Sequence, residues 1–206
     1  MMINSKIRIN SDLGEGTGVE KDIMPFLSSC SIACGGHTGD KSSMTDTILI
    51  AKKYGVNIGA HPSYPDKENF GRKNISISHA DLSNSLISQI DDLDRIAGSL
   101  ETSLNHIKLH GALYNFSAND LETASIIIEL MKLKYSDKIL YVPYGSLISE
   151  LAIDNNIDAD KLIPGTGLCS IKDTVIYSKA IAKLKVKAIF GFVGLNFLTQ
   201  HLNEMD

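Results

Sequence analysis

Several features that would place the chain in a common class of protein are absent from its 206 residues. The three cysteines, Cys30, Cys34 and Cys169, form no CxxC pair and no zinc-binding spacing, which is typical of reduced thiols in a cytosol. The opening residues MMINSKIRIN contain no apolar signal core. The longest apolar stretch, at 188–198, is shorter than the ~20 residues of a membrane span. We therefore expect a cytoplasmic protein that does not enter a membrane.

The charge and the absence of certain motifs exclude further classes of protein. The net charge is -4 and the basic residues are scattered, so the sequence predicts no nucleic-acid partner and no attachment to a membrane surface. No GxxxxGK[ST] motif is present, so a self-contained nucleotide-phosphate loop of that type is not expected. No GxSxG elbow is present, so covalent acyl-enzyme chemistry has no signature.

What the sequence does contain is a regular alternation of short strands and helices. Strands are predicted at 6–10, 29–34, 56–60, 106–109, 138–142, 161–164 and 188–193. Helices are predicted at 41–55, 78–98, 120–134 and 174–185. This order predicts an α/β fold with parallel strands, and we expect a TIM-like (β/α) barrel of about seven strands forming one domain over residues 1–206.

The side chains at the ends of the early strands favour a barrel. Each strand alternates between an apolar phase and a small or polar phase. If helices cover the apolar phase, the polar phase points into the barrel. Asp12, His37, His61 and His110 continue that polar phase at or just beyond the carboxyl ends of four strands. We expect them to converge at the mouth where such barrels carry their chemistry.

This cluster leaves two kinds of chemistry open. Imidazoles and carboxylates could transfer protons without a metal, with Asp12 and Glu15 as a carboxylate pair across a glycine turn. A divalent metal is also possible, with Asp12, His61 and His110 as ligands, but no compact motif such as HExxH supports it. Lys108 lies in the same phase as His110 and would stabilise an oxyanion.

Two segments following the third and fourth strands are candidates for substrate binding. The first, HPSYPDKENFGRK, offers Tyr64, Asp66 and Arg72, and the arginine suits a substrate carboxylate. The second, LHGALYN, is expected to form a loop that presents Tyr114 and Asn115.

The residues around His37 are also informative. We expect Gly35 and Gly36 to leave space beside His37. Asp40 either caps the following helix or contacts substrate.

Five segments in this order, NSDLGEGTG, MPFLSSCSIACGGHTGD, GVNIGAHPSYPDKENFGRK, SQIDDL and HIKLHGALYN, resemble the LamB/YcsF family. The resemblance covers roughly the first 120 residues. It implies a barrel related to polysaccharide deacetylases, and hydrolytic, ATP-coupled opening of the 5-oxoproline lactam to L-glutamate. It also implies the role of the A component of a 5-oxoprolinase, which acts with partner subunits B and C that would handle most of the ATP binding.

The resemblance implies a set of site residues at the matching positions. These are Asp12, Glu15, His37, Asp40, His61, Asp66, Arg72, Lys108, His110 and Tyr114. The sequence departs from the family at Gly36, where a phenylalanine is usual and a hole or wider pocket is expected, and in its divergent last third, which lacks the family's FADR and HGD motifs. Two alternative functions therefore stay open: a metal-dependent amidase or deacetylase acting on a small or carbohydrate substrate, and a non-catalytic binding subunit.

Overall fold

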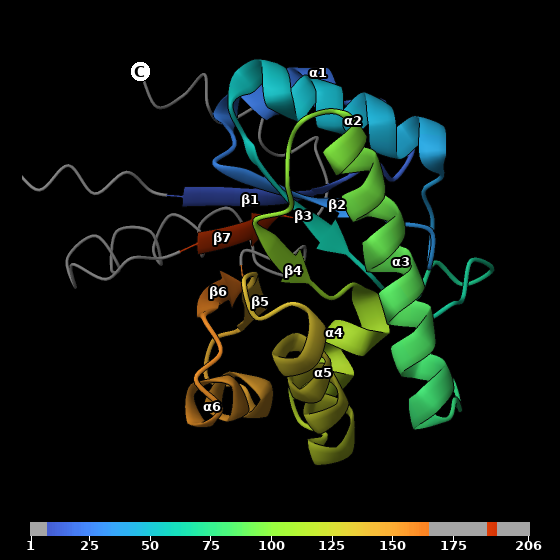
Figure 1. The fold of residues 1–206 in the computed structure, drawn as a ribbon, viewed down its shortest axis with the longest axis vertical. Helices are drawn as coiled ribbons and strands as arrows, with labels where there is room; N and C mark the ends of the chain where they lie inside the picture. Colours follow the sequence, from blue (N-terminus) through green and yellow to red (C-terminus); the bar gives the residue numbers. More distant parts are fainter. Residues whose placement is uncertain (1–7, 165–188, 193–206) are drawn as a thin grey trace, which may run out of the picture.

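The computed structural model describes residues 8–164 and 189–192. At its centre, five parallel strands form a curled sheet in chain order (Figure 1). The strands are β1 (Arg8–Leu13), β2 (Ser29–Ala33), β3 (Asn57–His61), β4 (His106–Lys108) and β5 (Ile139–Pro143). The predicted parallel α/β order is thus confirmed. The backbones of β6 (Ala159–Pro164) and β7 (Ile189–Phe192) extend the ladder, with β6 pairing with β5, and β7 pairing with β6 and β1.

Helices follow one another between successive strands from β1 to β6 and lie outside the sheet (Figure 1). They are α1 (Glu20–Ile23), the 3-10 turn η1 (Met24–Phe26), α2 (Lys41–Tyr54), α3 (His79–Ser99), α4 (Gly111–Ser117), α5 (Leu121–Lys134) and α6 (Leu147–Asp154). In the described ranges, no helix combines the length and apolar character needed to cross a membrane.

Local sequence signals explain where the long helices begin and end. The Asp40 carboxylate accepts a hydrogen bond from the Ser43 backbone N–H, and the Ser43 hydroxyl oxygen accepts one from the Asp40 backbone N–H. The two bonds together form a capping box. Gly55 ends α2 in the left-handed conformation. Ser78 caps α3 and Asp120 caps α5 through similar side-chain bonds. The three predicted helices in this region are confirmed, whereas the helix predicted at 174–185 lies outside the described residues.

The apolar phase of β2 and β3 packs against the helices, as expected. Cys30, Ile32 and Ile58 are almost fully buried and join the core with the apolar faces of α2 and α3. Burial also raises the pKa of both Cys30 and Cys34 to about 12, with smaller contributions from neighbouring groups. These two thiols are core residues and not reactive groups.

The prediction of a loop at LHGALYN was wrong, because residues 111–117 form helix α4. The helix begins at Gly111, whose φ of 56° turns the chain directly out of β4, and it buries Leu113 in the core. Helix α6 was not predicted, although Ser146 caps it in the usual way. Both helices are short, so their apolar periodicity extends over only about two turns.

Candidate functional site

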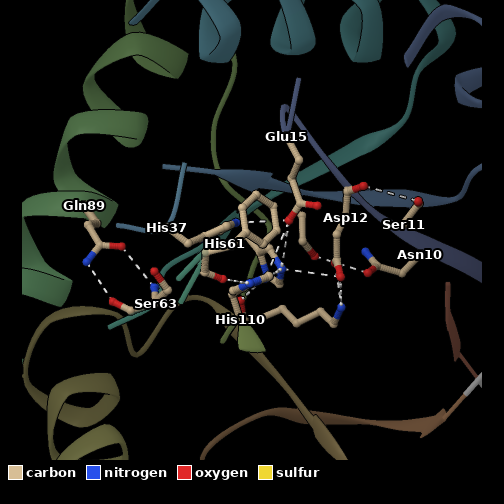
Figure 2. Close-up of polar contacts among 12 residues, drawn as sticks. Asn10, Ser11, Asp12, Glu15, His37, His61, Ser63, Gln89 and His110 are labelled. Carbon is tan, nitrogen blue, oxygen red and sulfur yellow. Dashed lines mark hydrogen bonds and ion pairs between the residues drawn. The ribbon is translucent and has the colours of Figure 1, made fainter. Parts of the chain in front are cut away.

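The carboxyl ends of the first four strands bring the predicted polar residues to one place (Figure 2). Asp12 lies near the end of β1, His61 is the last residue of β3 and Lys108 is the last residue of β4. Two further groups, Glu15 and His37, come from the turns that follow β1 and β2. His110 lies at the start of α4 and completes the cluster. The expected convergence of these side chains is therefore observed.

Lys108 and Asp12 form a buried ion pair within this cluster. The Lys108 Nζ lies 2.5 and 2.8 Å from the two Asp12 carboxylate oxygens, and the side chains are 8% and 5% exposed. Burial by itself raises the pKa of Asp12, but the charges of His61 and Lys108 and their hydrogen bonds outweigh it and hold that pKa well below its usual range. Asp12 is a carboxylate whose charge is compensated by lysine.

Main-chain carbonyls fix the orientation and tautomer of two imidazoles. The His61 Nδ1–H donates to the carbonyl oxygen of Lys108 at 2.7 Å, and the His110 Nε2–H donates to that of Phe70 at 3.0 Å. A carbonyl oxygen accepts only, so these nitrogens carry the ring protons. The opposite nitrogens, His61 Nε2 and His110 Nδ1, face each other at 3.0 Å. Both of these atoms face the centre of the site.

Glu15 and His37 close the cluster on the side of β1 and β2 (Figure 2). The His37 Nε2 lies 3.0 Å from Glu15 Oε1, and its ring stacks on that of His110 with centroids 3.6 Å apart. Burial lowers the pKa of His37 against the opposing effect of the Glu15 hydrogen bond. Burial, together with the neighbouring rings of His61 and His37, lowers the pKa of His110 to about 2. His37 and His110 are therefore neutral near pH 7.

Four of these residues could hold a metal ion. One ligand atom from each of Glu15, His37, His61 and His110 lies within 4.8 Å of the others, and the three histidines are buried. Imidazole and carboxylate donors suit divalent ions such as zinc. The set differs from the one expected from sequence, since it includes Glu15 and His37, while Asp12 is paired with Lys108.

The loop between β3 and α3 covers the imidazoles. Phe70 adopts φ 54°, which is unusual for a bulky residue, and its ring lies edge-on to His37 and His110 at 5.0 and 5.3 Å. Its carbonyl holds His110, as described above. The next residue, Gly71, also has positive φ, and a Cβ there would press on the His37 and His110 side chains. This backbone turn therefore permits the close packing of loop and histidines.

The sequence profile of the LamB/YcsF family matches residues 7–162 of the chain. The chain belongs to the LamB/YcsF family.

Curated relatives share this region at moderate identity. The A component of 5-oxoprolinase from Syntrophobacter fumaroxidans is 38% identical over 151 residues, which cover 71% of this chain and 60% of the relative. The A component from Acinetobacter baylyi is 39% identical over 158 residues, or 74% of this chain and 62% of the relative. The chain thus spans about three fifths of the length of these relatives.

A solved structure agrees with the fold. The crystal structure of the lactam utilization protein from Thermus thermophilus matches with a TM-score of 0.73 and 31% identity, covering 77% of this chain and 66% of that one.

Several predicted substrate-binding residues of this LamB/YcsF protein lie around the cluster, and others do not. The Lys108 Nζ lies 5.8 Å from the ring centroid of Tyr114, and burial together with the Asp12 charge raises the pKa of that tyrosine. Arg72 stacks over Phe70 at 5.3 Å, at the edge of the covering loop. Asn115 lies on the exposed part of α4.

Three other predicted residues have structural contacts. Asp40 is the α2 cap. Tyr64 is buried at 2% exposure, and its hydroxyl bonds Thr123 near the start of α5. Asp66 accepts hydrogen bonds from the backbone and side-chain amides of Asn69 within its own loop. The other carboxylate oxygen of Asp66, Oδ2, is buried and has no hydrogen-bond partner among the described residues.

The expectation of a hole at Gly36 was wrong. A Cβ at that position would overlap the side chains of Gln89 and Ser63, which occupy the space. The Gln89 amide accepts from the Ser63 N–H at 3.0 Å and donates to the Ser63 carbonyl at 2.9 Å, so it ties α3 to the covering loop. Gly35 has a different function, because its φ of 102° suits a turn, and a Cβ there would meet only the Gly39 carbonyl, at 3.9 Å. The contact of Gln89 with Ser63 could not be predicted from the sequence, because nothing in the sequence distinguishes this glutamine from other polar residues of an amphipathic helix.

A second polar layer lies below the cluster, and the sequence did not predict a role for it. His106 is fully buried, lies 3.1 Å from the Ser31 hydroxyl and 3.4 Å from the Asn10 amide, and stacks on Tyr141. Burial, with the charge of Lys108, lowers the pKa of His106 to about 3. Gly59 makes room for this ring, since a Cβ there would overlap it. The layer supports the strands that carry the cluster.

Proposed function

We propose that the protein is the A component of an ATP-dependent 5-oxoprolinase, which opens the 5-oxoproline lactam to L-glutamate. The observation that carries the proposal is the cluster of Asp12, Glu15, His37, His61, Lys108 and His110 at the mouth of the sheet, in a chain whose curated relatives bear that name. The reaction adds one water across the lactam C–N bond, so that the carbonyl carbon gains the water oxygen and the ring nitrogen gains a proton. A second water is consumed as ATP is hydrolysed to ADP and inorganic phosphate.

The charges of the site suit this reaction. A lactam is a resonance-stabilised amide, so its carbonyl carbon is a poor electrophile until its oxygen is activated, which gives ATP a chemical purpose. The Lys108 ammonium provides positive charge for an oxygen that becomes negative in the transition state. Glu15 is the carboxylate that contacts imidazoles instead of lysine, and it is the best-placed base for the attacking water. His37, His61 and His110 then orient Glu15 and the water.

Substrate binding is proposed at the loop over β3 and at α4. Arg72, at the edge of the covering loop, would bind the 5-oxoproline carboxylate through its two-pronged guanidinium. Tyr114 would form the wall beside Lys108.

The partners and the remaining architecture belong to the same proposal. The sequence has no nucleotide-phosphate loop of the GxxxxGK[ST] type, which favours ATP handling largely by subunits B and C. The pairing of β7 with both β6 and β1 supports closure of the sheet into a seven-strand barrel. In this proposal the barrel forms one domain over residues 1–206, and the protein is cytoplasmic.

Reconstitution tests this function. The chain is mixed with subunits B and C, ATP and 5-oxoproline, and released glutamate is measured. We expect glutamate only when all components are present, with none when ATP or either partner is omitted. Absence of glutamate from a mixture that is active with one of the curated relatives in place of this chain would refute the proposal.

One observation favours a second candidate, a metal-dependent amidase or deacetylase. The four potential ligands described above form a set that could hold a metal. This candidate predicts hydrolysis of a small or carbohydrate amide without ATP and without partners, and loss of that activity in the presence of a chelator. Full activity with chelator would exclude it.

A further inference from the structure

Two ring nitrogens, His61 Nε2 and His110 Nδ1, face each other among the carboxylates of the site. They lie 3.0 Å apart, and the second nitrogen of each ring is committed to a carbonyl. Carboxylate oxygens lie close to both nitrogens: Asp12 Oδ2 is 3.4 Å from His61 Nε2, and Glu15 Oε1 is 3.6 Å from His110 Nδ1 and 3.9 Å from His61 Nε2. Buried carboxylates beside imidazole nitrogens favour a cation shared among them.

The lysine of the site does not supply that cation. The Lys108 ammonium is bound to both oxygens of Asp12. Its charge is therefore compensated by Asp12, while Glu15 and three imidazoles remain around a common centre.

The second nitrogens show the support that metal-bound histidines have in proteins. A histidine that binds a metal commonly donates its other ring N–H to a carbonyl or carboxylate, which fixes the tautomer and aims the free lone pair. The carbonyls of Lys108 and Phe70 do this for His61 and His110. Among the described residues, His37 Nδ1 is buried and has no hydrogen-bond partner, so this ring is fixed by its contacts with Glu15 and the neighbouring rings.

We propose that this centre binds one divalent transition-metal ion of the Zn²⁺ or Co²⁺ class, with Asp12 outside the ligand set. The ligands are Glu15, His37, His61 and His110. Three nitrogen donors and one carboxylate favour these ions over Mg²⁺ or Ca²⁺, which prefer oxygen donors. The inference deepens the proposed function by assigning a cation to the same site, but the ion-binding test does not depend on lactam opening.

Direct titration tests the site. The full chain is treated with a chelator, dialysed, and titrated calorimetrically with Zn²⁺ and separately with Mg²⁺. We expect one Zn²⁺ per chain, and an affinity for Mg²⁺ at least 100-fold weaker. Binding should also raise the midpoint of thermal unfolding, because the ion binds the folded chain.

Variants separate ligands from neighbours. Glu15→Gln keeps the size of the side chain and should weaken Zn²⁺ binding at least tenfold, as should His37→Ala. The control is His79→Ala, which removes an imidazole that is 59% exposed on α3 and should leave the affinity unchanged. Circular dichroism of each variant checks that the fold is kept.

The visible spectrum of bound Co²⁺ tests the place of Asp12, because its bands report the ligand set. The bands should shift in Glu15→Gln and keep their positions in Asp12→Asn. Zn²⁺ affinity equal to that of the parent chain in both folded variants, Glu15→Gln and His37→Ala, would overturn the proposal, as would the absence of stoichiometric binding. Loss of Co²⁺ bands in Asp12→Asn alone would overturn the ligand assignment.

Discussion

At the scale of single residues, the buried pair of Lys108 and Asp12 separates the site into two parts. One part is a compensated ion pair at hydrogen-bond distance, and the other consists of Glu15 and the three histidines. The two parts meet where Asp12 Oδ2 lies 3.4 Å from His61 Nε2. The two carboxylates therefore have different roles, although the sequence places them three residues apart. Their partners determine the difference.

Breaking the ion pair should destabilise the fold strongly. Lys108→Met leaves the Asp12 carboxylate buried without its ammonium, and we expect a loss of about 3–5 kcal/mol in the free energy of unfolding. The double variant Asp12→Asn with Lys108→Met removes both charges and should recover at least half of that loss. Urea unfolding of both single variants and the double variant measures the coupling. Simple additivity of the two single effects would contradict the ion pair as described.

His106 should make the stability depend on pH. Its pKa is about 3 in the folded chain, against about 6.5 in the unfolded chain. Below pH 6.5 the unfolded chain therefore binds a proton that the folded chain does not bind until about pH 3. Stability falls as the pH decreases through this range, by about 1.4 kcal/mol per pH unit for this residue.

The test compares urea unfolding at pH 7 and pH 5. His106→Gln should reduce the pH-dependent loss by about 2 kcal/mol relative to the parent chain. His79→Gln, at an exposed position, should leave the loss unchanged. An unaltered loss in His106→Gln would show that this imidazole is not the group responsible.

Much of the site at this scale could be predicted from alternation alone. His61 and Lys108 follow from the polar phase of β3 and β4, because the phase of a strand fixes which side of a sheet a residue faces. The partners could not be predicted. Contact between Glu15 and His37 depends on two turns meeting in space, and the space beside Gly36 is filled by Gln89 from a helix more than fifty residues later.

At the scale of elements, α4 and the covering loop depend on two glycines that approach each other. Gly111 has φ 56°, and a Cβ there would overlap the carbonyl oxygen of Gly71, which accepts a hydrogen bond from the Ala112 N–H at 2.9 Å. This junction places His110 under the loop. A short helix that begins this way cannot be recognised by apolar periodicity, which explains why α4 was expected to be a loop.

Substitution of glycines should therefore have opposite effects in two helices. Gly111→Ala should destabilise the protein by about 1–3 kcal/mol, because the left-handed conformation and the close carbonyl both oppose a side chain. Gly98→Ala, inside α3 where a Cβ would meet nothing within 4 Å, should stabilise it by about 0.5–1 kcal/mol. Thermal and urea unfolding measure both. Equal effects of the two substitutions would refute the described junction.

At the scale of the whole molecule, strand order and helix order were predictable where periodicity is strong. The parallel order from β1 to β5 and the helices α2, α3 and α5 agree with expectation, because each has either strict alternation or clear caps. The last third carries weaker signals, and the chain spans about three fifths of its relatives' length. Within the described residues, the groups of the site come from the first four strands and the segments that directly follow them.

Glutamate release in the reconstituted complex, compared between two histidine variants, tests the central claim most directly. The claim is that the groups at the carboxyl ends of β1 to β4 act together on the lactam. His110→Ala removes an imidazole from their centre and should lower turnover by about 10²-fold or more, while circular dichroism shows an intact fold. His79→Ala removes one from the surface and should leave turnover unchanged. Full activity in His110→Ala would contradict the account.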